Sequence, residues 1–157
     1  MLQKMISGGQ TGADRAALDV GLRLAFPVGG FCPRNRLAED GCIDKVYPLV
    51  ELPGGYRQRT RANVDAADAT VLFYEAPING GTQFTWRYCV KRQKPHILID
   101  ISAVNHLEAV KTIRDFVMQY EITTLNVAGP RASRCAAMYG YVYAVLAEIV
   151  GATGQCT

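Results

Sequence analysis

Short apolar runs alternate with longer stretches of helical periodicity along most of the chain. The apolar runs are only a few residues long, and in the segments between them apolar residues recur every three or four positions. Continuous apolar strands are typical of a sheet covered on both faces, and their alternation with helices favours parallel pairing. The pattern predicts strands at 4–7, 26–31, 69–74, 96–100 and 123–128, and helices at 13–25, 57–68, 82–92, within 102–120 and at 131–150.

The order of these elements predicts an α/β fold. We expect a Rossmann-like, doubly wound and mainly parallel sheet of about five strands, with helices on both faces. The segment 32–50 interrupts the pattern, because it has no clear period and contains several turn residues. We expect an irregular excursion there, with one helical turn near 37–40. No repeat or domain boundary is visible, so we expect 1–157 to form a single ligand-binding domain.

Composition and charge narrow the class of protein. The 157 residues are 49% hydrophobic and 20% charged, as in ordinary globular proteins. The net charge of +3 comes without a basic stripe, which argues against nucleic acid as a partner. No apolar stretch approaches the ~20 residues of a membrane span, and no signal peptide is apparent. Five cysteines without a Cys-x-x-Cys pair and only two histidines favour free thiols in the cytoplasm and no metal site.

A glycine-rich loop follows the first predicted strand. It contains Gly8, Gly9 and Gly12, and a helical pattern begins at once after it. Backbone N–H groups at the start of a helix attract phosphate or another oxyanion, so the loop predicts an anion site. Thr11 and Asp14 form a T-x-x-D signature, from which we expect Thr11 to cap the helix with Asp14 as its capping partner.

Two further loops of this kind come after predicted strands. The first is 79–82, with two glycines and a threonine at the start of a helix; the second is 129–133, where Pro130 suits a first helical position. Arg131 and Arg134 add positive charge to the latter loop. Ligands of such sheets bind beyond the carboxyl ends of the strands, so we expect the three loops to converge on one anion.

An arginine-rich block and one acidic residue complete the set of candidates. Within 56–64, Arg59, Thr60 and Asn63 either face the ligand or belong to a solvated basic face. Glu75 comes just after a strand and is the best remaining carboxylate for site chemistry. No paired acids and no nucleophile with a nearby base are visible, so we assign no catalytic residue and favour binding over catalysis.

The stretch Ile-Ser-Gly-Gly-Gln-Thr-Gly-Ala-Asp-Arg-Ala-Ala-Leu-Asp at 6–19 resembles the opening signature of the molybdenum carrier family. The segments 59–64, 67–70 and 80–82 agree with it, so that the similarity spans nearly the whole chain. The resemblance implies a Rossmann-like superfamily that includes DprA-like and Lonely-Guy proteins, which bind nucleotides or related phosphate-bearing ligands. Plant and algal carriers of this group bind molybdenum cofactor and form oligomers. By analogy, the pocket would be lined by Gly8, Gly9, Thr11, Gly12, Arg59, Gly80, Gly81 and Thr82.

One departure bears on activity. Lonely-Guy enzymes carry a Pro-Gly-Gly-x-Gly-Thr loop followed by a catalytic glutamate, whereas here the loop is Asn-Gly-Gly-Thr-Gln at 79–83 without that glutamate. The sequence therefore favours a carrier of molybdenum cofactor, with a nucleotide-binding protein or nucleotide N-glycosidase as the alternative. In line with the resemblance we expect a homo-oligomer, a dimer or tetramer, and the apolar, tyrosine-rich last helix serves either such an interface or the core. The expected ligand contacts are Ser7, Gly8, Gly9, Gln10, Thr11, Gly12, Asp14, Arg59, Thr60, Asn63, Glu75, Asn79, Gly80, Gly81, Thr82, Gly129, Arg131 and Ser133.

Overall fold

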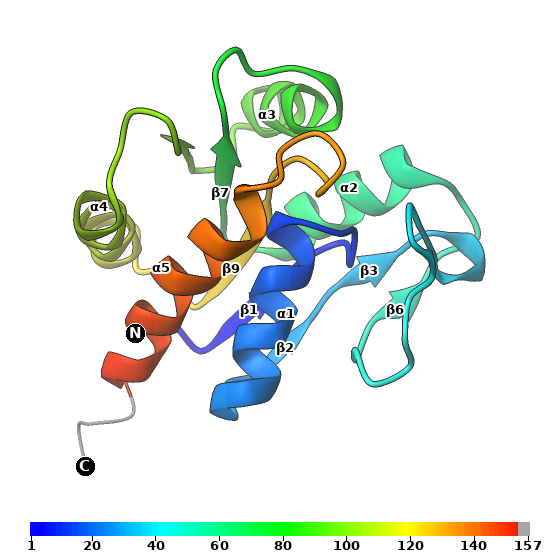
Figure 1. The fold of residues 1–157 in the computed structure, drawn as a ribbon, viewed down its shortest axis with the longest axis horizontal. Helices are drawn as coiled ribbons and strands as arrows, with labels where there is room; N and C mark the ends of the chain where they lie inside the picture. Colours follow the sequence, from blue (N-terminus) through cyan, green and yellow to red (C-terminus); the bar gives the residue numbers. More distant parts are fainter. Residues whose placement is uncertain (154–157) are drawn as a thin grey trace.

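A five-stranded parallel sheet forms the centre of the protein, whose computed structural model describes residues 1–153 (Figure 1). Its strands lie in the order β2-β1-β9-β7-β8, and each strand runs parallel to its neighbours. This arrangement confirms the predicted Rossmann-like α/β class. The strands are β1 (Lys4–Ile6), β2 (Val28–Gly29), β7 (Ala69–Tyr74), β8 (His96–Asp100) and β9 (Thr124–Ala128).

Helices cover both faces of this sheet. Three helices, α1 (Ala13–Leu24), α4 (His106–Gln119) and α5 (Met138–Thr153), pack together on one face. The other face is covered by α2 (Tyr56–Ala66) and α3 (Gly80–Arg92). Consecutive residues of β7 therefore point into two apolar layers. Burial on both faces explains why β7 reads as an unbroken apolar run and was predicted with its observed bounds.

The carboxyl ends of β1, β9 and β7 are adjacent in the sheet. The loops that follow these three strands consequently meet at one edge, as expected from the sequence. The strand order also leaves β1 and β7 on either side of β9, and their crossovers lead to helices on opposite faces. Crevices at the carboxyl edge of such a sheet are the usual place for a ligand.

The last helix begins later than predicted. Residues 131–137 form turns, which are closed by hydrogen bonds from the N–H groups of Arg134 and Cys135 to the carbonyl of Arg131, 3.0 and 3.3 Å long. α5 starts only at Met138, so Pro130 does not take a first helical position. The prediction was wrong here because these turns repeat the three- and four-residue spacing of a helix without continuing it.

The irregular excursion is a small layer of its own. β3 (Phe31–Cys32) pairs in parallel with β6 (Val50–Glu51), and between them lie a 3-10 turn, η1 (Arg34–Arg36), and a hairpin. The hairpin joins β4 (Leu37–Ala38) to β5 (Gly41–Cys42). The helical turn expected at 37–40 was therefore wrong, because that segment is the hairpin and the helical turn precedes it.

A single guanidinium holds much of this excursion together. Arg36 donates hydrogen bonds to the carbonyls of Ile43, Asp44, Tyr47 and Leu49, over 2.8 to 3.3 Å. These backbone carbonyls are satisfied by one side chain and not by regular secondary structure. The segment therefore needs no periodic apolar face, which explains why its sequence pattern was uninformative. Among the helices of residues 1–153, none is long and apolar enough to cross a membrane.

Candidate functional site

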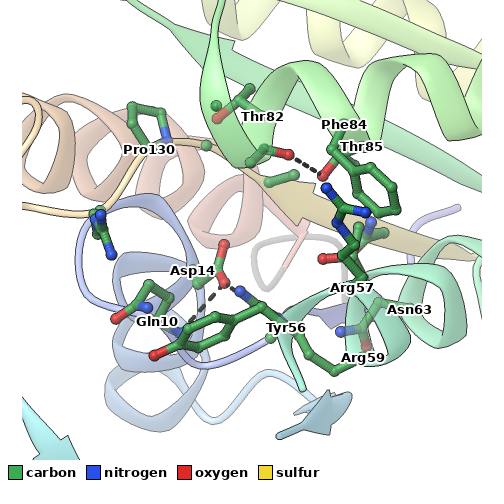
Figure 2. A pocket seen from close by; sticks show the side chains of 18 of the residues that line it. Gln10, Asp14, Tyr56, Arg57, Arg59, Asn63, Thr82, Phe84, Thr85 and Pro130 are labelled. Carbon is green, nitrogen blue, oxygen red and sulfur yellow. Dashed lines mark hydrogen bonds and ion pairs between the residues drawn. The ribbon is translucent and has the colours of Figure 1, made fainter. Parts of the chain in front are cut away.

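A hollow of about 590 Å³ opens at the carboxyl edge of the sheet (Figure 2). Its walls come from the loops after β1, β7 and β9 and from the first turns of α2 and α3. The predicted ligand residues that line it are Gly8, Gln10, Asp14, Arg59, Thr60, Asn63, Asn79, Gly80, Gly81, Thr82, Gly129 and Arg131. Residues 7, 9, 11, 12 and 133 lie outside this lining.

Glu75 lies in a smaller hollow next to the main one. This hollow measures about 300 Å³ and shares Asn79, Thr82, Pro130 and Arg134 with its larger neighbour. The Glu75 carboxylate accepts a hydrogen bond from the Cys135 thiol at 3.7 Å. Burial and the nearby carboxylate raise the pKa of this thiol. Among residues 1–153, no group of three or more His, Cys, Asp or Glu side chains could hold a metal ion.

The glycines of the loop after β1 make room for other parts of the protein. A Cβ on Gly8 would lie 1.5 Å from Nη1 of Arg59, and one on Gly9 would lie 2.6 Å from Cδ1 of Leu49. Gly12 has φ +84°, and its Cβ would lie 2.3 Å from the carbonyl oxygen of Pro130. Close protein contacts thus account for all three glycines.

Asp14 forms a buried ion pair at the floor of the hollow. Its side chain is only 7% exposed, and Oδ2 accepts a 2.8 Å hydrogen bond from Nη1 of Arg59 and a 3.3 Å bond from the N–H of Gln10. Burial raises the pKa of the Asp14 carboxyl, and the Arg59 guanidinium acts in the opposite direction. Nε of Arg59 is buried and has no acceptor. The buried pair fixes the position of α2 relative to the loop after β1.

The expected T-x-x-D cap does not form. Gly12 is the N-cap of α1 and no side chain caps this helix, while the Thr11 hydroxyl contacts Glu39 and the N–H of Ala132 instead. Asp14 is consequently an ion-pair partner of Arg59, not a capping partner of Thr11. The Ser7 hydroxyl donates to the carbonyl of Asp14 at 2.8 Å, which also fixes this loop internally.

Asn63 is committed to protein contacts although it lines the hollow. Its side-chain amide accepts from the N–H of Phe31 at 2.9 Å and donates to the Phe31 carbonyl at 3.0 Å. This pair of bonds ties α2 to β3. Asn63 therefore shapes the wall, while Arg59 and Thr60 bring functional groups to it.

The start of α3 is the open part of the site. Asn79 is its N-cap but makes no side-chain capping bond, and a Cβ added to Gly81 would meet nothing within 4 Å. Gly55 is the N-cap of α2, which also has no side-chain cap and starts on the same hollow. Two helix N-termini thus present N–H groups and partial positive charge to one space.

Arginines strengthen this positive potential. Arg59 is paired with Asp14, and Arg131 lies 3.6 Å from a carboxylate oxygen of Glu39. Arg57 and Arg134 line the hollow, and neither forms an ion pair with another residue of the described chain. The guanidinium of Arg57 lies over the Phe84 ring, with 5.2 Å between its central carbon and the ring centroid. The hollow therefore has two cationic groups available for an anion.

Sequence reasoning missed several lining residues. The Gly-Gly pair at 54–55 could have marked α2 as another helix that starts at the site. A polar side chain at 126 within an apolar strand was a second signal; Asn126 donates to Thr70 at 3.3 Å and lines the hollow. The missed lining residues are Gly55, Tyr56, Arg57, Gln58, Phe84, Thr85, Asn126, Val127 and Ala128, while Pro130 was noted only as part of its loop and Arg134 only as a nearby positive charge.

Comparisons with known proteins agree with this architecture. Residues 5–150 match the family described as "Circularly permutated YpsA SLOG family". The chain is also similar to a crystal structure from Syntrophus aciditrophicus SB named "Putative molybdenum carrier protein". The two share 37% sequence identity with a TM-score of 0.92, over 95% of this chain and 94% of that chain. No curated protein matches the chain. The similarity confirms the resemblance to molybdenum carriers predicted from the motif at 6–19.

Proposed function

Because this chain belongs to the circularly permutated YpsA SLOG family, we propose that its site binds a phosphate-bearing cofactor, and specifically molybdenum cofactor. The comparisons support a ligand-binding protein. The name of the Syntrophus aciditrophicus relative favours a molybdenum-related ligand. Molybdenum cofactor would be the cargo of such a carrier.

The start of α3, between Arg57 and Arg134, carries the proposal. Its N–H groups are uncapped by side chains, Gly81 leaves them accessible, and both guanidinium groups are free of carboxylate partners in the described chain. A helix N-terminus with arginines on the same hollow fits the phosphate of the cofactor. The volume of about 590 Å³ lies within the range of small-molecule sites, which leaves room for the pterin.

Retention of the cofactor tests this proposal. Purified protein is mixed anaerobically with molybdenum cofactor released from a molybdoenzyme, and the cofactor that co-elutes in gel filtration is measured by the fluorescence of its oxidised pterin. We expect the wild type to retain the cofactor and Arg57→Ala and Arg134→Ala each to weaken binding about tenfold, the loss expected for one charge-assisted hydrogen bond.

Arg87→Ala is the matched control. Arg87 is an exposed arginine of α3 that lies outside the lining, so this variant removes the same charge without altering the hollow. It should retain the cofactor like the wild type. Failure of the wild type to retain the cofactor would contradict the proposal, as would equal losses in all three variants.

Glu75 supports the second candidate, a nucleotide-binding protein with N-glycosidase activity. Glycosidic bond cleavage needs a carboxyl group that can act as acid or base, and Glu75 stands beside the anion site without an ion-pair partner in the described chain. Incubation with nucleoside monophosphates would release free base and ribose phosphate, and Glu75→Gln would abolish the release. Absence of release across the common nucleotides excludes this candidate.

A further inference from the structure

The tip of the β4–β5 hairpin lies against the loop after β1 and the turns after β9. Glu39 and Asp40 form this tip. The Glu39 carboxylate contacts the Thr11 hydroxyl, accepts from the N–H and hydroxyl of Ser133 at 3.1 and 2.5 Å, and lies 3.6 Å from Nε of Arg131. Its own N–H donates to Oε1 of Gln10 at 2.9 Å. A carboxylate from the excursion thus occupies a set of donors contributed by two other loops.

These donors are those of an oxyanion site. They comprise two hydroxyls, one backbone N–H and one guanidinium, a combination that recognises phosphate groups in proteins. The hydrogen bonds from Ser133 and Thr11 hold the pKa of the Glu39 carboxyl below its usual range, so it carries a negative charge at neutral pH. Thr11 and Ser133 do not line the main hollow, whereas Arg131 does, so this donor set adjoins the main hollow and shares one arginine with it.

We propose that Thr11, Arg131 and Ser133 form a second oxyanion-binding site, which is filled here by the chain's own Glu39. Its ligand is a phosphate group, either free or carried by a phosphomonoester. The Glu39 side chain is 20% exposed, so the donors lie close to solvent and an external anion can reach them once the carboxylate leaves. This inference is independent of which molecule occupies the main hollow.

The hairpin stays attached without Glu39. Asp40 pairs with Arg15 at 3.0 Å, and the Tyr47 hydroxyl donates to Asp19 at 2.6 Å. These contacts anchor the excursion to α1 and involve none of the proposed donors. Glu39 can therefore be replaced while the neighbouring segments keep their positions, and the carboxylate acts as a tethered competitor of an external phosphate.

Amide NMR signals report on the two sites separately. We compare titrations of wild type and Glu39→Ala with inorganic phosphate, and follow the N–H signals of Ser133 for the second site and Gly81 for the main hollow. In Glu39→Ala, the Ser133 signal should reach half-saturation at a phosphate concentration at least about tenfold lower than in the wild type, because a charge-assisted competitor is gone. A parallel titration with ribose 5-phosphate distinguishes free phosphate from a phosphomonoester, because the preferred ligand is the one with the lower half-saturating concentration.

Two variants serve as controls. Glu51→Ala removes another carboxylate of the excursion, one that accepts from the N–H of Asn35 at 2.6 Å, and should leave the Ser133 titration unchanged. Adding Ser133→Ala to Glu39→Ala removes a hydroxyl donor, and the signal of the residue 133 amide should then require about tenfold more phosphate.

An unchanged Ser133 titration in folded Glu39→Ala would overturn the inference. Should Glu39→Ala fail to fold, Glu39→Gln decides in its place. Its neutral amide competes less well than the carboxylate, so the half-saturating phosphate concentration at Ser133 should fall. A concentration equal to that of the wild type would refute the second site. A silent Gly81 signal beside a responding Ser133 signal would count against the proposed function alone.

Discussion

The loop after β1 and the start of α3 share the same order of strand, glycines and helix, yet they differ in what surrounds them. In the first loop, Gly8, Gly9 and Gly12 are in close contact with protein atoms. At the start of α3, Gly81 faces open space on the main hollow. The loop with the more specific sequence signature is thus the more enclosed of the two.

This difference shows that glycines at a strand-to-helix turn have two uses. They allow either another part of the chain or a ligand to approach the backbone closely, and the local sequence is the same in both cases. The atoms that cover the first loop belong to Arg59, Leu49 and Pro130, which lie far from it in sequence. Only the tertiary structure distinguishes an enclosed loop from an open one.

Removal of Arg59 should have the largest effect on the enclosed loop. Arg59→Ala leaves the Asp14 carboxylate buried without its cation, and we expect about 3–5 kcal/mol of lost stability near neutral pH. Arg59 also lowers the pKa of the Asp14 carboxyl against the effect of burial, so this pKa rises further in the variant. Chemical denaturation at several pH values measures the loss.

The pH dependence of this stability loss follows from the raised pKa of the Asp14 carboxyl. A carboxyl with a raised folded-state pKa favours the folded state once it is protonated, so the deficit of Arg59→Ala should shrink as the pH falls through that pKa. Arg61→Ala is the control, because it removes another arginine of α2, an exposed one that lies over the Phe84 ring of α3. It should lower the unfolding free energy by less than about 1 kcal/mol. A loss in Arg59→Ala no larger than in this control would show that the ion pair does not hold the loop.

The main strands could be predicted from the sequence because a strand buried on both faces of the sheet is a continuous apolar run. β7 and β8 appear as apolar runs and were located with their observed bounds. Turns were harder to predict. The hydrogen bonds of residues 131–137 have the spacing of a helical turn, and the side chain of Arg36 holds the excursion together without a periodic sequence pattern. The last helix was therefore predicted to start at residue 131, seven residues before its observed start at Met138.

The candidate site was predicted to a similar extent. Loops after three strands could be placed together, because parallel strands share a carboxyl edge. For Arg59, Thr60 and Asn63 the sequence left open whether they face the ligand or belong to a solvated basic face. The role of Glu39 could not be inferred, because it reaches Ser133 across 94 positions from the tip of a hairpin with two-residue strands. Long-range contacts of single side chains leave no local pattern.

Gly12→Ala should have the next largest effect. The residue has φ +84°, which is unfavourable for alanine, and the new methyl group would lie 2.3 Å from the backbone oxygen of Pro130. Strain and the displacement of this backbone should together cost about 2–3 kcal/mol. Thermal and urea unfolding measure the change, and a variant as stable as the wild type would show that the loops after β1 and β9 are not tightly packed.

Gly81→Ala is the counterpart at the open site and should have the smallest effect on stability. Its methyl group meets no atom within 4 Å, and alanine suits a helix at least as well as glycine, so the change in unfolding free energy should stay within about 0.5 kcal/mol. The same methyl group would stand where a phosphate approaches the N–H groups of α3. We expect about tenfold weaker binding of inorganic phosphate, followed through the amide signal of Thr82. Unchanged affinity would mean that the open glycine, like the enclosed ones, serves the fold and not a ligand.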